Sequence, residues 1–200
     1  METFRRCRRD QQGGSLVEYA FAIPMALALL LAVFDFGHIY LRWILAEKAT
    51  HHAARIAAVR PPICPGVPAI NDRADPNGTD RFGTPCAGGV CASPGTIACD
   101  GAPGDPTVDE LFADIAPMLP GNPTPANLRF TYDFSGIGFL GGPYVPMVAV
   151  ELQNLTVPYV TPFAQLFRLY GAAGPAFGPL TMPPMRATMP GEDLNQGTLG

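Results

Sequence analysis

An uninterrupted apolar run near the start of the chain constrains its fold more than any other feature. Residues 20–34 contain no charged side chain, and four arginines precede them: Arg5, Arg6, Arg8 and Arg9. A helix over residues 15–34 spans roughly 30 Å, the thickness of a bilayer's hydrocarbon core. Positively charged flanks stay on the cytoplasmic side of a membrane. The sequence therefore predicts a membrane helix whose N-terminus is cytoplasmic, with the rest of the chain outside.

A glycine and a carboxylate mark the start of this run. Gly13 is followed by four residues, Gly14 to Val17, and then by Glu18 and Tyr19. A carboxylate at the mouth of a membrane helix is costly, so it indicates a function. The pattern resembles the G-X-X-X-X-E-Y processing site of type IVb prepilins, in particular the TadE/TadG-like pseudopilins of the tight-adherence (Flp) pilus system. The resemblance covers residues 5 to about 60 well and the C-terminal strands loosely.

The resemblance implies a minor pseudopilin-like structural subunit that serves pilus assembly or surface adhesion. It would be held in the inner membrane by a single span, with a periplasmic or extracellular C-terminal domain. A prepilin peptidase would cut between Gly13 and Gly14 and remove residues 1–13 as a basic leader. Glu18 and Tyr19 would act in assembly with other pilins or pseudopilins and with pilus assembly proteins.

Two other interpretations of the N-terminus remain open. A secretory signal peptide needs small residues after its apolar run, and Phe34-Asp35-Phe36-Gly37-His38 suits that cleavage poorly. A plain signal anchor is not processed at all and leaves Glu18 without a role. The corresponding alternative function is an unprocessed, membrane-anchored extracytoplasmic binding module unrelated to pili. Neighbouring genes for a secretion ATPase and a prepilin peptidase would favour the pilus function.

The helix is predicted to continue beyond the membrane, over residues 14–60 in all. No glycine or proline interrupts residues 38–60, and Pro61 and Pro62 end the pattern. Small residues recur at i+3 and i+4 spacing on one face, where they allow close approach of another element. This alanine seam consists of Ala46, Ala49, Ala53 and Ala57. It packs either against another subunit or against the chain's own external domain.

A loop rich in cysteine, proline and glycine begins the external domain. Residues 61–200 suffice for one small domain, and residues 61–107 predict a loop with little regular structure. This loop contains four cysteines: Cys64, Cys86, Cys91 and Cys99. Outside the cytoplasm, such a cluster favours two disulfides that staple the loop, and three pairings are possible. A zinc site is the rival interpretation, while Cys7 in the leader should be unpaired.

The predicted fold class is α+β, with the long helix followed by a small antiparallel sheet. Alternating apolar residues predict strands over residues 127–134 and 144–152, which plausibly form a hairpin. Residues 155–169 contain Thr161-Pro162-Phe163 and resemble the strand-then-TPF segment of TadE-like domains. Prolines restrict a last strand, in residues 177–187, to a sheet edge.

Two further local expectations concern a short helix and the C-terminus. Residues 107–119 show a helical apolar stripe, with Thr107 as the expected cap and Glu110 at the matching capping-box position. Residues 192–200 are expected to form a frayed tail.

No group of residues forms a catalytic, cofactor-binding or metal-binding pattern. The G-x-G-x-x-G sequence at residues 136–141 is followed by Gly142-Pro143 and another strand, so it indicates a hairpin loop and not a dinucleotide site. His51 and His52 are adjacent on a helix and point about 100° apart, so they do not chelate one metal. The net charge of −4 gives no support for nucleic-acid binding. The sequence predicts a structural protein and not an enzyme.

Overall fold

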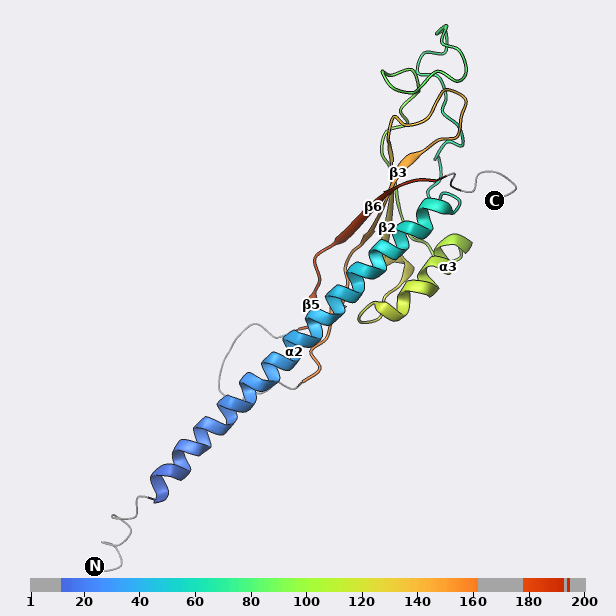
Figure 1. The fold of residues 1–200 in the computed structure, drawn as a ribbon. Coiled ribbons are helices and arrows are strands. Elements are labelled where there is room, and N and C mark those ends of the chain that lie inside the picture. The colour runs from blue at the N-terminus through green and yellow to red at the C-terminus, as the bar shows by residue number, and fades with distance from the viewer. Residues whose placement is uncertain (1–11, 162–177, 193, 195–200) are drawn as a thin grey trace, which may run out of the picture. The chain divides into compact units, whose positions relative to one another are not determined.

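The computed structural model describes residues 12–161, 178–192 and 194 (Figure 1). It divides the chain into two compact units. The first unit comprises Met1–Leu41 and Pro158–Pro179, and the second comprises Arg42–Val157 and Leu180–Gly200. Residues 1–11 of the leader, including Cys7, lie outside the described residues, as do Pro162 and Phe163.

Helix α2 (Gln12–Val59) is continuous through Pro24 and contributes residues to both units. The predicted long N-terminal helix is therefore confirmed. A proline inside a water-exposed helix is costly, whereas membrane helices tolerate one better. Within the first unit, large apolar side chains of α2 are more than half exposed, among them Leu16, Phe21, Met25, Leu29, Phe34 and Leu41. This helix is long and apolar enough to cross a membrane.

The part of α2 in the second unit carries small, buried side chains. All four residues of the alanine seam are at most 1% exposed, and Ala54 and Ala58 are also buried. The Thr50 hydroxyl donates a hydrogen bond to the Ala46 carbonyl oxygen at 2.8 Å, so its polar group is satisfied within the helix. The sequence left open whether another subunit or the chain's own external domain covers this seam. In the structure the seam is buried within the chain itself.

A four-stranded antiparallel sheet forms the body of the second unit, in the order β1-β2-β3-β6. The strands are β1 (Ile97–Asp100), β2 (Leu128–Phe134), β3 (Pro146–Leu152) and β6 (Met185–Pro190). The predicted hairpin of β2 and β3 is confirmed, with Phe130 opposite Val150. Strand β6 lies at an edge, as predicted for this last strand region. A separate pair consists of β4 (Thr156–Val157) and β5 (Leu180–Thr181).

The two faces of the four-stranded sheet differ sharply. One face is apolar and buried, with Phe130 and Tyr132 on β2 and Val148 and Val150 on β3. The other face carries alternating charges on residues that are opposite one another across the four strands: Asp100, Arg129, Glu151 and Arg186. A slip of one residue would move each strand's apolar side chains to the polar face, so this pattern specifies the register.

The short helix begins differently from the sequence prediction. Helix α3 (Pro106–Ile115) is capped by Asp105, whose side chain accepts hydrogen bonds from the N–H groups of Thr107 and Val108 at 2.9 and 3.1 Å. The prediction that Thr107 caps this helix is therefore wrong. Pro106 is well suited to the first helical position because it lacks an N–H there, so the cap lies one residue before it. A 3₁₀ turn, η1 (Ala116–Met118), follows.

Three other expectations are corrected. The loop 61–107 contains strand β1, so it is more regular near its end than predicted. The last strand region is two strands, because Pro183 and Pro184 separate β5 from β6. The C-terminal tail is not frayed at Glu192, whose N–H donates to the Ala58 carbonyl oxygen at 2.8 Å, nor at Leu194, which is fully buried. A second 3₁₀ turn, η2 (Pro125–Asn127), precedes β2.

Candidate functional site

The predicted processing motif lies in the first turns of α2. Gly13 and Gly14 are already helical, and Glu18 is about one turn further along. The Glu18 side chain is exposed, and no hydrogen bond or ion pair joins it to another described residue. Tyr19 is 65% exposed. Both side chains are accessible to groups outside the chain, and their role in assembly stays a prediction.

A buried carboxylate in the first unit was not singled out as functional from the sequence. Asp35 lies on α2 and is only 2% exposed. Its side chain accepts hydrogen bonds from the N–H groups of Val160 and Thr161, both at 3.0 Å, and from the Thr161 hydroxyl. We call this set of contacts the Asp35 clasp. It satisfies one carboxylate with three donors from a segment more than 100 residues away in the sequence.

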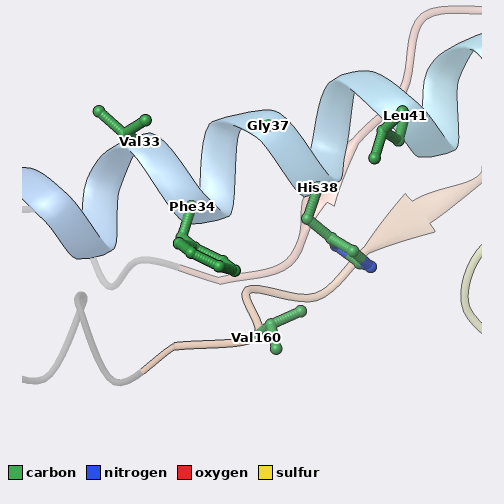
Figure 2. A pocket seen from close by; sticks show the side chains of 6 residues that line it. All are labelled: Val33, Phe34, Gly37, His38, Leu41 and Val160. Atoms are coloured by element: carbon green, nitrogen blue, oxygen red, sulfur yellow. The ribbon is translucent and has the colours of Figure 1, made fainter.

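A small apolar groove lies next to the Asp35 clasp (Figure 2). Val160 faces the helix there, and Phe34 and His38 extend toward it from α2. Gly37 has no side chain, and a Cβ added to it would meet no atom within 4 Å, so the helix surface is open at this point. Apart from the imidazole, the lining side chains are apolar: Val33, Phe34, Leu41 and Val160. The groove therefore suits an apolar group.

The four cysteines of the loop form two disulfides, Cys64–Cys99 and Cys86–Cys91, with Cα–Cα distances of 5.5 and 4.8 Å. The prediction of two disulfides is confirmed, and the structure selects one of the three pairings. Cys64–Cys99 links the chain just after α2 to the edge strand β1. Cys86–Cys91 closes a short loop whose two cysteines are buried against Leu140.

The glycine-rich hairpin loop between β2 and β3 holds the cysteine-rich loop. Asn71 donates from its N–H to the Gly142 carbonyl oxygen and accepts from the Gly141 N–H, both at 2.8 Å, and the Cys86 N–H donates to the Gly138 carbonyl oxygen at 3.0 Å. Gly138 has φ +103°, a backbone conformation that disfavours other residues. The G-x-G-x-x-G sequence thus joins two strands and serves as a scaffold.

Four large apolar side chains are exposed on these two loops. We call this set the tip patch: Ile70, Phe82, Ile137 and Phe139. Phe82 is 78% exposed, and the Arg73 guanidinium lies 5.8 Å from the centre of its ring. Exposed apolar residues that gather in one region indicate a contact surface.

Within residues 12–161, 178–192 and 194, no three His, Cys, Asp or Glu side chains gather closely enough to hold a metal ion.

Comparison with protein families gives a match for the N-terminal helix. The family model described as TadE-like protein matches residues 13–55. The matched segment begins at Gly13, includes Glu18 and Asp35, and ends within the part of α2 that carries the alanine seam. The resemblance to TadE-like proteins is therefore confirmed for this helix. No curated protein matches the chain, and no solved structure does.

Proposed function

We propose that this chain is a minor pseudopilin-like subunit that serves tight-adherence pilus assembly or surface adhesion. It is a structural protein and not an enzyme. It is anchored in the inner membrane by α2, with its N-terminus in the cytoplasm and the domain from residue 61 in the periplasm or outside the cell. One observation carries the proposal: the TadE-like match begins at Gly13 and covers a helix whose large apolar side chains are exposed.

Processing by a prepilin peptidase would occur between Gly13 and Gly14. A peptide in a helix must unwind before it enters a protease site. Gly13 and Gly14 favour unwinding, because each glycine makes a helix about 1 kcal/mol less stable than alanine does. They also lie in the first turn, where helices open most easily. Cleavage would leave a free amino group at Gly14.

This amino group gives Glu18 a partner in a neighbouring subunit. A carboxylate near the bilayer is unfavourable alone, and an opposite charge compensates for it. Glu18 lies about one turn from Gly14 in its own helix, so each processed subunit offers both an amine and a carboxylate near the same end. In subunits placed side by side, the Gly14 amine of one subunit would pair with the Glu18 carboxylate of the next. Because only processing creates that amine, assembly would depend on processing.

The Glu18→Gln variant tests this role, because glutamine keeps the size and removes the charge. We expect normal expression, membrane insertion and external disulfides, together with loss of cross-links to partner pilins and of piliation. Glu47→Gln is the matched control: Glu47 is another exposed carboxylate of α2, outside the processing motif. Normal piliation and cross-linking in Glu18→Gln would contradict the charge pairing.

The tip patch favours a second candidate function, a membrane-anchored binding module unrelated to pili. Its four side chains lie on the cysteine-rich loop and on the glycine-rich hairpin loop, outside the residues that match the TadE-like model. Deletion of the gene separates the two functions. A pilus subunit predicts loss or shortening of pili, whereas a binding module predicts normal pili. Neighbouring genes for a secretion ATPase and a prepilin peptidase would favour the pilus function.

A further inference from the structure

We propose that the Asp35 clasp brings the segment 158–161 into the membrane together with α2, so that lipid acyl chains fill the groove beside Val160. The inference rests on the membrane anchoring in the proposed function and names a second membrane contact of the first unit. It does not depend on a role in pili.

The first step concerns the charge of Asp35, which interrupts an otherwise apolar helix surface. An ionised side chain inside a bilayer is costly and is almost always paired or turned away from lipid. Asp35 meets both conditions, since it is 2% exposed and accepts three hydrogen bonds. Its neighbours Phe34 and Phe36 are 70% and 62% exposed. The outward surface of α2 is therefore apolar on both sides of the carboxylate.

The second step concerns the backbone of the segment 158–161. Irregular backbone enters a bilayer only where its polar groups are satisfied within the protein. The N–H groups of Val160 and Thr161 both donate to Asp35, and Pro158 has no N–H. The carboxylate therefore satisfies both of these N–H groups without water. The Val160 side chain remains 66% exposed, which leaves it free to contact lipid.

The third step concerns the spacing of aromatic residues along α2. Tyrosine and tryptophan gather where the hydrocarbon core meets the headgroups. Tyr19 and Tyr40 are 65% and 66% exposed, and the 21 residue steps between them correspond to about 32 Å of helix, close to the hydrocarbon thickness. Trp43 follows Tyr40 by one turn. These boundaries shift the span from the predicted residues 15–34 to about residues 20–39 and place Asp35 within it.

An acyl chain is the occupant that fits the groove best. Its lining is apolar apart from His38, and Phe34 and Leu41 continue from it onto the exposed apolar surface of α2. A helix at this depth is surrounded by lipid, so a groove open to that surface meets acyl chains first. Gly37 leaves room for a chain to lie against the backbone.

Tryptophan fluorescence in brominated lipids tests this depth, because bromine on an acyl chain quenches only nearby indoles. Trp43 is the sole tryptophan, so Trp43→Phe provides a dark background for single-tryptophan variants of the full chain. The vesicles contain phosphatidylcholine and phosphatidylglycerol with brominated acyl chains. We expect strong quenching in Val160→Trp, comparable to that in the reference Leu29→Trp. Phe82→Trp in the tip patch is the exposed control and should keep its intensity.

Variants at Asp35 test whether the clasp holds the segment in the membrane. Adding Asp35→Ala to the Val160→Trp variant removes the acceptor, and we expect most of the quenching to be lost and the emission to shift to longer wavelength. Asp35→Asn keeps one carbonyl acceptor and should retain part of the quenching.

Two results would overturn the inference and leave the membrane anchor standing. One is a Val160→Trp variant that stays unquenched while Leu29→Trp is quenched, as expected if a protein partner or water covers the groove. The other is quenching of Val160→Trp that persists unchanged with Asp35→Ala. An unquenched Leu29→Trp would overturn the inference together with the membrane anchor. Loss or retention of pili bears only on the proposed function, because the fluorescence test uses the purified chain in vesicles.

Discussion

The two parts of α2 expose opposite kinds of side chain. In the first unit its large apolar residues are exposed, as in Met25 at 78% and Leu29 at 68%. In the second unit its small residues are buried, as in Ala49 and Ala53 at 0%, while charged residues such as Lys48 are exposed. One secondary structure thus serves two environments. Bulky residues give a helix apolar area for lipid, whereas alanines allow a sheet to approach its backbone closely.

The largest effect that separates the two parts should follow loss of the disulfide that ties the end of α2 to the sheet. Cys64–Cys99 closes a loop of 35 residues and Cys86–Cys91 one of 5, for which the loop-entropy relation gives about 4 and about 2 kcal/mol. Both double variants should therefore unfold at lower denaturant concentration than the parent chain. The midpoint should fall further in Cys64→Ser/Cys99→Ser than in Cys86→Ser/Cys91→Ser.

Membrane insertion is the control for this comparison, because α2 should insert independently of the second unit. Extraction of membranes at alkaline pH should leave both double variants in the pellet. Equal midpoints for the two variants would contradict the loop-length ordering, whereas loss of insertion would show that the two parts of the helix depend on each other.

The second-largest difference between the two parts of α2 should follow replacement of an alanine by the larger leucine. Ala53→Leu inserts bulk on a fully buried face, and overpacking of this kind costs about 1–3 kcal/mol. Ala26→Leu makes the same change at an exposed position of the first unit, where the expected change is within about 0.5 kcal/mol. Urea unfolding of the two variants in detergent measures the difference. Similar losses in both would contradict the contrast between the exposed and the buried part of the helix.

The smallest effect should appear at two buried tyrosines of the second unit. The Tyr132 hydroxyl accepts a hydrogen bond from the Ile63 N–H at 3.1 Å, just after α2. Among the described residues the Tyr144 hydroxyl has no partner. Tyr132→Phe should therefore cost about 1 kcal/mol, whereas Tyr144→Phe should be neutral or stabilising. An equal loss of stability in the two variants would contradict a stabilising role for the hydrogen bond between Ile63 and Tyr132.

The same burial makes the contribution of Tyr132 depend on pH. Burial raises the pKa of Tyr132 above its ordinary value near 10, despite the opposing effect of the bond from Ile63. A group with a raised folded-state pKa stabilises the fold below its unfolded pKa and loses that effect as pH rises through the folded pKa. The free energy of unfolding should therefore fall above about pH 10, and less so in Tyr132→Phe.

Local patterns in the sequence were enough to predict the long helix and the β2–β3 hairpin. Hydropathy over residues 20–34 and the absence of glycine and proline from residues 38–60 define α2. Strict alternation from Leu128 to Phe134 defines both the strand and its buried face. The cap of α3 was wrong by two residues because Asp105 and Thr107 are both good caps, and Pro106 decides between them. Strand β1 was missed because its four residues become a strand only by pairing with β2.

Part of the candidate site could be predicted from local sequence and part could not. Gly13, Glu18 and Tyr19 form a motif within seven residues, so it can be recognised without a structure. The Asp35 clasp joins positions 126 residues apart, and its only local signal is a carboxylate just after an apolar run. The alanine seam was recognised as a contact face, but spacing alone did not distinguish a partner subunit from the chain's own external domain.

The N-terminal residue of the membrane-bound protein tests the proposed function most directly. Expressed with a prepilin peptidase, the chain should have an intact mass and an N-terminal sequence that begin at Gly14. Gly13→Leu should block the cut because the peptidase needs a small residue there. Gly14→Ala is the matched control: it keeps the small residue before the cut and its methyl group meets no atom within 4 Å in the structure, so it should still be cut. A protein that still begins at Met1 with the peptidase present would contradict the pseudopilin function.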